Sequence, residues 1–235
     1  MSVVNPVVTE SHFEILLRMR ASDGTIYSPG MFLPAAERYS LIDKIDRQVA
    51  DLAMSWISRQ SIGPDTSLKV NINLSATTVS DDQFQEYLLN RINELGVNAK
   101  HLCFEITESA AMKNIFKTIE FLNSMRSLGC TIALDDFGSG FSSLSQLQTL
   151  PIDYIKIDGA LIKDLPDSEI NRALVKSVSE VAKILKVKTV AEFVENEEIL
   201  HVLSELDIDY AQGYLFGKPT ELVDLSLSGG LSDAA

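Results

Sequence analysis

Five acidic residues stand at the ends of short apolar segments, where α/β proteins place their chemistry: Glu14, Glu105, Asp135, Asp136 and Glu192. An ionised carboxylate without a partner in a partly buried site costs several kcal/mol, or it takes up a proton and becomes neutral. Carboxylates gathered together also repel one another. We therefore infer that bound cations lie among these acids.

The ligand chemistry indicates which cations these are. The three histidines, His12, His101 and His201, lie outside the acidic segment ends, so the ligands are oxygen atoms. Oxygen ligands favour Mg²⁺ or Mn²⁺ over Zn²⁺. Adjacent Asp135 and Asp136 could serve two bridged ions, an arrangement suited to phosphodiester hydrolysis. The alternative for each single acid is that it caps a neighbouring helix.

Short apolar segments alternate with longer amphipathic ones along the chain, and this alternation is typical of α/β proteins. We expect strands over residues 13–19, 69–74, 102–107, 131–135, 154–157, 188–193 and 209–212. We expect helices over residues 35–59, 81–95, 115–128, 168–185 and 197–206. Residues 80–83, Ser-Asp-Asp-Gln, are predicted to form a capping box at the start of the second helix.

Side chains alternate between the two faces of a strand, so residues two or four apart share a face. The polar pairs that share a face are Glu14 with Arg18, Asn71 with Asn73, and Lys156 with Asp158. In an open doubly wound sheet only the strand ends at the switch point would meet. A barrel brings all strand ends to one rim, so we predict a (β/α)8 TIM-like barrel.

Composition indicates one acidic globular domain. The 235 residues include 20 basic and 33 acidic ones, for a net charge of −13, and 46% are hydrophobic. This charge argues against binding to DNA. Residues 1–222 are assigned to the domain, and residues 223–235 are expected to be a disordered tail. No apolar run suits a membrane span and no signal peptide is recognised, so we expect a cytoplasmic protein without membrane contact.

The two cysteines and a glycine-containing segment also allow predictions from residue type. Cys103 and Cys130 lie among apolar residues and are expected to be buried free thiols. Residues 136–143, Asp-Phe-Gly-Ser-Gly-Phe-Ser-Ser, follow a predicted strand and contain two glycines. This segment is either an ordinary strand-to-helix turn or a mobile lid beside the metals.

An ordered set of motifs resembles the EAL-domain family of cyclic di-GMP phosphodiesterases. The signature itself is similar to Glu-Ile-Leu-Leu-Arg at residues 14–18. Further motifs follow in the family's order at residues 70–75, 104–108, 135–140, 155–159, 191–195 and 212–214. The resemblance runs from about Pro6 to Pro219. It implies a barrel enzyme of bacterial second-messenger signalling.

The resemblance also implies a role for each matching residue. Glu14, Asn73, Glu105 and Asp135 would bind one metal ion, with Asp135 bridging to a second ion held partly by Asp136. The other roles are positioning of the attacking water by Lys156, support of metal and water by Asp158 and Glu192, phosphate binding by Arg18, a place in the site for Gln212, and anchoring of residues 138–143 by Glu108. The proton acceptor stays open between Glu192, Lys156 and neither.

The beginning of the chain departs from the family pattern. The family places a Gln-Pro-Ile-Val strand about fourteen residues before the signature Glu, preceded by a helix. Here the counterpart is Asn-Pro-Val-Val at residues 5–8, only nine residues ahead of Glu14. We therefore expect a shortened first strand and helix region. Ile15 replaces the usual Ala and should affect packing only.

The expected function is metal-dependent hydrolysis of cyclic di-GMP to linear pGpG. Two Mg²⁺ or Mn²⁺ ions would take part and Ca²⁺ would inhibit. One alternative is a catalytically weak cyclic di-GMP receptor, and another is a different metal-dependent barrel hydrolase. The resemblance further implies a homodimer and a longer protein with upstream sensory or cyclase domains.

Overall fold

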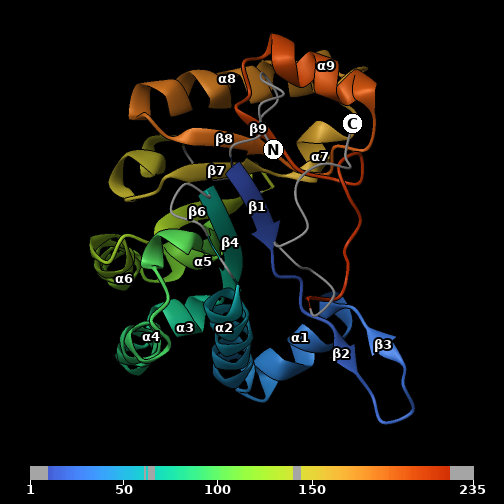
Figure 1. Ribbon diagram of the computed structural model, residues 1–235. Helices are drawn as coiled ribbons and strands as arrows, with labels where there is room; N and C mark the ends of the chain where they lie inside the picture. Colours follow the sequence, from blue (N-terminus) through green and yellow to red (C-terminus); the bar gives the residue numbers. More distant parts are fainter. Residues whose placement is uncertain (1–9, 61, 63–66, 140–143, 223–235) are drawn as a thin grey trace.

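The structure is a computed structural model, and we describe its residues 10–60, 62, 67–139 and 144–222 (Figure 1). The predicted first-strand counterpart at residues 5–8 and the predicted tail at residues 223–235 lie outside the described residues. Within the described part, no helix is both long and apolar enough to cross a membrane.

One curved sheet of seven parallel strands forms the centre of the molecule. The strands are β1 (Glu10–Glu14), β4 (Ser67–Leu74), β5 (Leu102–Thr107), β6 (Thr131–Phe137), β7 (Tyr154–Ile157), β8 (Lys188–Ala191) and β9 (Tyr210–Ala211). They lie in chain order without the reversal that defines a doubly wound sheet. The prediction of a TIM-like barrel is confirmed.

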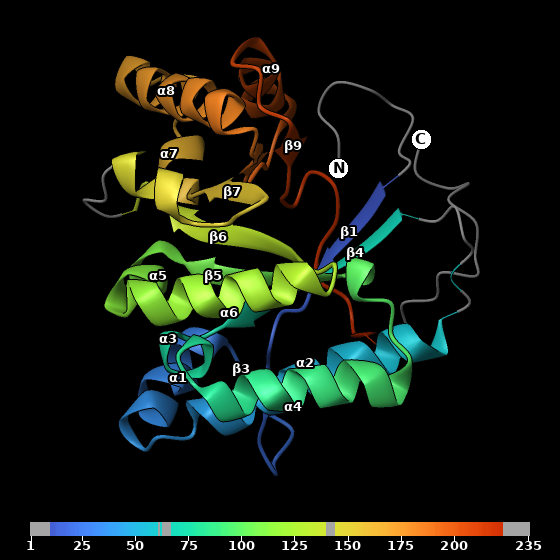
Figure 2. The ribbon, with the colours of Figure 1, turned by 90° about the vertical axis from the view of Figure 1, so that its left-hand side faces the viewer.

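Helices cover the outside of this sheet (Figure 2). The longer ones are α2 (Ile42–Arg59), α4 (Asp82–Leu95), α6 (Ile115–Ser127), α8 (Glu169–Leu185) and α9 (Glu197–Glu205). Short helical segments sit at the loops: α3 (Ala76–Val79), α5 (Glu108–Lys113), α7 (Gly159–Ile162), η1 (Ala99–His101) and η2 (Leu144–Thr149). The outward residues of β4, Val70, Ile72 and Leu74, are buried under the helices. The polar residues of that strand are thereby left on the inner face.

Two predicted elements at the beginning of the chain were wrong in extent. The predicted helix over 35–59 is two helices, α1 (Pro29–Arg38) and α2, separated by Ser40, whose φ of 53° is left-handed. The predicted strand over 13–19 ends at Glu14. Arg18 lies beyond it, so the inference that Arg18 shares a strand face with Glu14 was also wrong. A separate antiparallel pair follows, β2 (Met19–Arg20) with β3 (Ile26–Tyr27).

Helix caps agree in part with the sequence. Asp81 is the N-cap of α4, and its side chain accepts a hydrogen bond from the backbone of Gln83. The predicted capping box was therefore placed one residue early. Ser168 caps α8 as its predicted start requires. Cys103 and Cys130 are buried free thiols, as expected from the apolar residues around them.

Candidate active site

Acidic side chains gather at the carboxyl ends of the barrel strands, and we call this end of the barrel the acidic rim. The ammonium group of Lys156 lies at its centre. Its Nζ is 2.8 Å from Glu192 Oε1, 2.9 Å from Glu105 Oε2, 3.0 Å from Asp135 Oδ1 and 3.5 Å from Glu14 Oε2. The Lys156 side chain is 2% exposed. Strands β1, β5 and β6 carry Glu14, Glu105 and Asp135, Glu192 directly follows β8, and β7 carries the lysine. The convergence expected from strand ends of a barrel is therefore present.

The pKa values of these groups reflect burial and mutual charge. Burial alone would lower the pKa of Lys156, but the surrounding carboxylates raise it well above its usual value, so the lysine keeps its proton. Burial raises the pKa of Glu105 to about 8 and that of Glu192 to about 7, although the charge of Lys156 opposes both shifts. One ammonium group does not offset the combined effect of burial and repulsion on these two acids.

Glu14 differs from the other acids because it has more donors. Burial raises its pKa, but the charge of Lys156 and two amide donors outweigh burial and lower it. Gln212 Nε2 donates to Glu14 Oε2 at 2.6 Å, and Asn73 Nδ2 donates to Glu14 Oε1 at 2.9 Å. Glu14 is therefore held as an ionised carboxylate, with its two oxygens oriented by β4 and by the segment after β9.

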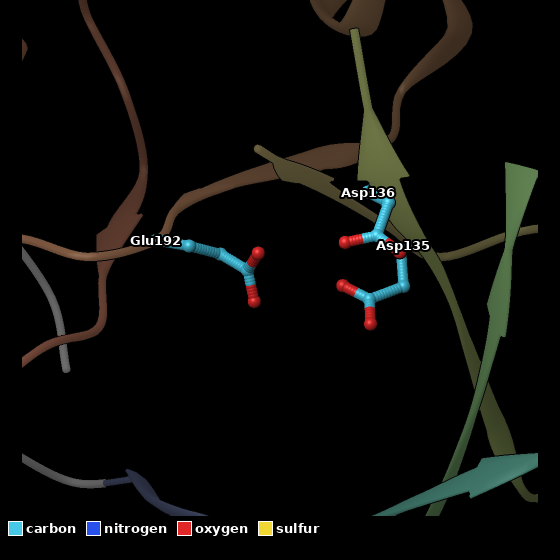
Figure 3. Close-up of side chains that lie close together, drawn as sticks. All are labelled: Asp135, Asp136 and Glu192. Atoms are coloured by element: carbon cyan, nitrogen blue, oxygen red, sulfur yellow. The ribbon is translucent and has the colours of Figure 1, made fainter. Parts of the chain in front are cut away.

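A local irregularity lets two consecutive aspartates reach the same side of β6. Regular alternation would place Asp135 and Asp136 on opposite faces. The pairing between β6 and β7 shifts register between Leu134 and Phe137, and Asp136 has a left-handed φ of 55°. Figure 3 shows the carboxylates of Asp135, Asp136 and Glu192 pointing toward one another. Burial and the charge of Asp135 raise the pKa of Asp136.

These residues fit a divalent cation. Ligand oxygens of Asp135, Asp136 and Glu192 all lie within 4.8 Å of one another. Asp135 Oδ1 is buried and has no hydrogen bond among the described residues, although it faces Lys156 Nζ. Carboxylate oxygens are the donors that Mg²⁺ and Mn²⁺ prefer. This grouping brings Glu192 together with the two aspartates, whereas Glu14 and Glu105 meet the cluster through Lys156.

Asn71 belongs to this network but was given no role from the sequence. Its Nδ2 donates to Glu105 Oε1 at 2.6 Å, and its side chain is buried. The inward face that Asn71 shares with Asn73 was the available signal. The contact orients Glu105 from below the rim, because Asn71 precedes Asn73 by two residues on β4.

Glu108 is buried at the first position of α5, where its side chain accepts a hydrogen bond from the backbone of Gly138. Thr107, and not Glu108, is the N-cap of that helix, and its side chain accepts a hydrogen bond from the backbone of Ala110. Burial raises the Glu108 pKa, and its Oε1 has no hydrogen-bond partner within the described residues. Residues 140–143 of the predicted lid lie outside the described part.

We expect Glu108→Ala to weaken catalysis through the Asp135–Asp136 segment. The substitution removes the acceptor for Gly138, two residues after Asp136, so Mg²⁺ affinity should fall about tenfold or more. The unfolding free energy should fall by about 1–3 kcal/mol, because a buried hydrogen bond to a carboxylate is lost. Glu94→Ala on the surface of α4 is the matched control. Wild-type Mg²⁺ dependence in Glu108→Ala would contradict the anchoring role.

Two other predicted residues lie at the edge of the cluster. Asp158 caps α7, accepting a hydrogen bond from Ala160 at 2.7 Å, and its charge contributes to the raised pKa of Asp136. Arg18 is exposed, and its guanidinium donates to Leu17 O at 2.7 Å. Among the described residues Arg18 makes no ion pair with the acidic cluster.

Comparison with known proteins gives the family. The cyclic di-GMP phosphodiesterase PdeB of Shewanella oneidensis is 41% identical over 210 residues, which cover 89% of this chain and 24% of PdeB. The cyclic di-GMP phosphodiesterase PdeF of Escherichia coli is 36% identical over 213 residues, covering 91% of this chain and 28% of PdeF. The chain thus spans about a quarter of the length of these two relatives.

A solved structure agrees with the fold as well as the sequence. The PaMucR phosphodiesterase, solved as a complex with c-di-GMP, is 32% identical with a TM-score of 0.83, covering 90% of this chain and 85% of that one. A model of the EAL domain family matches residues 3–219. Because this match includes every strand of the barrel and the whole acidic rim, the chain belongs to the EAL domain family.

Proposed function

We propose that this domain hydrolyses cyclic di-GMP to linear pGpG with Mg²⁺ or Mn²⁺ as cofactor. The observation that carries the proposal is the cluster of Asp135, Asp136 and Glu192 beside the buried Lys156. Relatives named cyclic di-GMP phosphodiesterases and the c-di-GMP complex of a similar structure support the choice of substrate. In the reaction, water adds to phosphorus, one P–O3′ bond breaks, and the 3′ oxygen gains a proton.

The rim residues have distinct proposed roles. Asp135, Asp136 and Glu192, with Glu14, Asn73 and Glu105, would hold two cations, which when bound polarise phosphate oxygens and lower the pKa of water. Lys156 keeps its proton and so orients water as a donor, which removes it as proton acceptor. Glu192 then remains the side-chain candidate for that step.

The proposed substrate contacts lie around this centre. Arg18 is exposed and carries the positive charge that a phosphate of the substrate needs. Gln212 donates a hydrogen bond to Glu14 through its side-chain amide, and we assign it a place beside the substrate. Asp158 would support the second cation through its position beside Asp136.

Product analysis separates the enzyme from the alternative of a receptor. The domain is incubated with cyclic di-GMP and Mg²⁺, and the products are separated by chromatography. Appearance of pGpG in proportion to the domain concentration supports the enzyme. Saturable binding of cyclic di-GMP without pGpG, in Mg²⁺ and in Mn²⁺, would favour the receptor. An Asp135→Asn variant serves as the control for contaminating hydrolases.

Ca²⁺ should compete with Mg²⁺ and inhibit turnover. It accepts the same carboxylate oxygens, but it prefers more ligands at about 2.3–2.6 Å, roughly 0.2–0.6 Å longer than the distances that Mg²⁺ prefers. Phosphate and water would then be displaced from the geometry that reaction needs. Initial rates at fixed Mg²⁺ should fall as Ca²⁺ rises and recover when Mg²⁺ is added. Equal turnover with either ion alone would contradict this geometry.

We also propose a cytoplasmic homodimer within a longer protein. The large share of each relative that lies outside the match supports additional domains. On α8, the side chains of Ile170, Leu174 and Ile184 are exposed and apolar, as in a subunit interface. Light scattering on the domain should give the mass of a dimer.

A further inference from the structure

Three aromatic side chains make mutual contacts inside the barrel. His12 of β1 lies 5.6 Å from Tyr210 of β9 and 5.7 Å from Tyr154 of β7, measured between ring centroids. The two tyrosine rings lie 6.1 Å apart. His12 stacks on Tyr210 at 29°, whereas the other two contacts are edge-to-face. We call these three residues the aromatic layer.

Each member of the aromatic layer precedes, by two positions, a polar residue that lies at the acidic rim. His12 precedes Glu14, Tyr154 precedes Lys156, and Tyr210 precedes Gln212. Residues two apart on a strand share a face, so the layer lies directly below those three rim residues. Glu14 contacts both Gln212 and Lys156, just as His12 contacts both Tyr210 and Tyr154. Glu14 accepts from Gln212 at 2.6 Å and lies 3.5 Å from Lys156 Nζ.

The aromatic layer lies between β1 and β9, the two described strands at the ends of the sheet order. Within the described residues, β1 pairs only with β4 and β9 pairs only with β8. No ladder hydrogen bond between β1 and β9 therefore sets their separation in that part of the chain. The His12–Tyr210 stack and the Glu14–Gln212 hydrogen bond are two side-chain contacts that cross the boundary between β1 and β9.

The opposite wall of the barrel carries small inward residues at the corresponding depth. Cys103 and Ala133 precede Glu105 and Asp135 by two positions, and both are buried. Large rings on one wall and small side chains on the other fill a barrel interior in layers. The rings thus occupy the side of the barrel where no strand pairing joins β1 to β9 among the described residues.

We propose that the aromatic layer is a positioning device for Glu14. By its thickness it sets the separation of β1 and β9, so that the Gln212 amide and the Lys156 ammonium reach the Glu14 carboxylate. His12, Tyr154 and Tyr210 are positioning residues, because they act through the rim and need no contact with substrate. The proposal rests on the proposed function, in which Glu14 is a metal ligand.

The test measures Mn²⁺ binding directly, by the loss of the free-ion electron paramagnetic resonance signal. Tyr210→Leu removes the ring that His12 stacks on, so the dissociation constant for Mn²⁺ should rise about tenfold, as for other residues that orient metal ligands. Tyr210→Phe keeps the ring and should bind Mn²⁺ more tightly than Tyr210→Leu does. In the Glu14→Gln background, Tyr210→Leu should lower Mn²⁺ affinity no further.

Phe121→Leu is the matched control for lost aromatic packing. Phe121 contacts Phe84 at 6.5 Å and Phe104 at 6.4 Å, in the layer between helices and sheet. This control should lower the melting temperature and leave Mn²⁺ affinity unchanged. Should Tyr210→Leu fail to fold, His12→Leu removes the ring on the other side of the boundary and carries the same expectation.

Four outcomes would overturn the positioning role. They are equal Mn²⁺ affinity in Tyr210→Leu and Phe121→Leu, binding by Tyr210→Phe as weak as by Tyr210→Leu, an undiminished effect in the Glu14→Gln background, and failure of both ring-removing variants to fold. Absence of pGpG from a wild-type domain that binds Mn²⁺ would instead refute the hydrolase and leave the positioning result standing. Absence of Mn²⁺ binding by the wild type would overturn both.

Discussion

Lys156→Met should abolish turnover and lower the free energy of unfolding by about 3 kcal/mol or more, because removing one partner leaves buried carboxylates uncompensated. The lysine side chain is 2% exposed and has four carboxylates around it, so solvent cannot replace its charge. Urea denaturation at pH 7 measures the loss. Added Mg²⁺ should restore part of the stability if the same carboxylates bind it.

The pH dependence of this loss has a definite sign. Without the lysine, the pKa values of Glu105 and Glu192 rise further above their unfolded values, so the folded variant binds more protons than the unfolded one. Stability then falls as pH rises. The deficit relative to wild type should be smaller at pH 5 than at pH 8.

Lys117→Met is the control for Lys156→Met. Lys117 pairs with Asp82 at 2.6 Å on the surface, where the side chains are 38% and 78% exposed. Exposed pairs contribute about 0–1 kcal/mol, so this variant should unfold almost as the wild type does. Equal stability losses in the two lysine variants, or a Lys156→Met deficit that grows toward low pH, would contradict the central role of Lys156.

Asp135→Asn should lower turnover about a thousandfold or more while the protein stays folded. Several kcal/mol of charge stabilisation depend on the bound cations, and each 1.36 kcal/mol corresponds to tenfold in rate. The substitution also removes a charge that raises the pKa values of Glu105, Asp136 and Glu192. Lost repulsion and the lost Lys156 contact act in opposite directions on stability.

Turnover and calorimetric Mg²⁺ titration, measured on the same Asp135→Asn preparation, test whether the loss of activity comes from lost metal binding. Asp82→Asn is the control, since it changes an exposed aspartate at the surface ion pair with Lys117. We expect wild-type turnover from the control and weak or absent Mg²⁺ binding from Asp135→Asn. Near-normal turnover of Asp135→Asn at saturating Mg²⁺ would remove Asp135 from the metal site.

Most strands and most amphipathic helices could be predicted because their signals are local. The apolar segments over 102–107 and 154–157 coincide with β5 and β7, and the helix predicted over 168–185 differs from α8 by one residue. The single helix predicted over residues 35–59 is divided in the structure, and the reason lies in the backbone conformation of one residue. Both halves carry apolar periodicity, and only the left-handed backbone at Ser40 divides them.

The sequence by itself determined the chemistry of the site: which strands end in acids, that the acids outnumber the cations, and that the side chains able to hold a cation offer oxygen atoms. These follow from residue types and a period of two along each strand. The tertiary structure alone decided which groups meet. Lys156 lies among four carboxylates because the sheet curves, and Asp136 joins Asp135 because the register shift and a positive φ override alternation. Glu108 is buried, and its carboxylate meets the backbone of Gly138, which lies thirty residues later in the chain. Curvature, register and burial depend on contacts between residues that are distant in the chain. A local sequence pattern therefore cannot predict them.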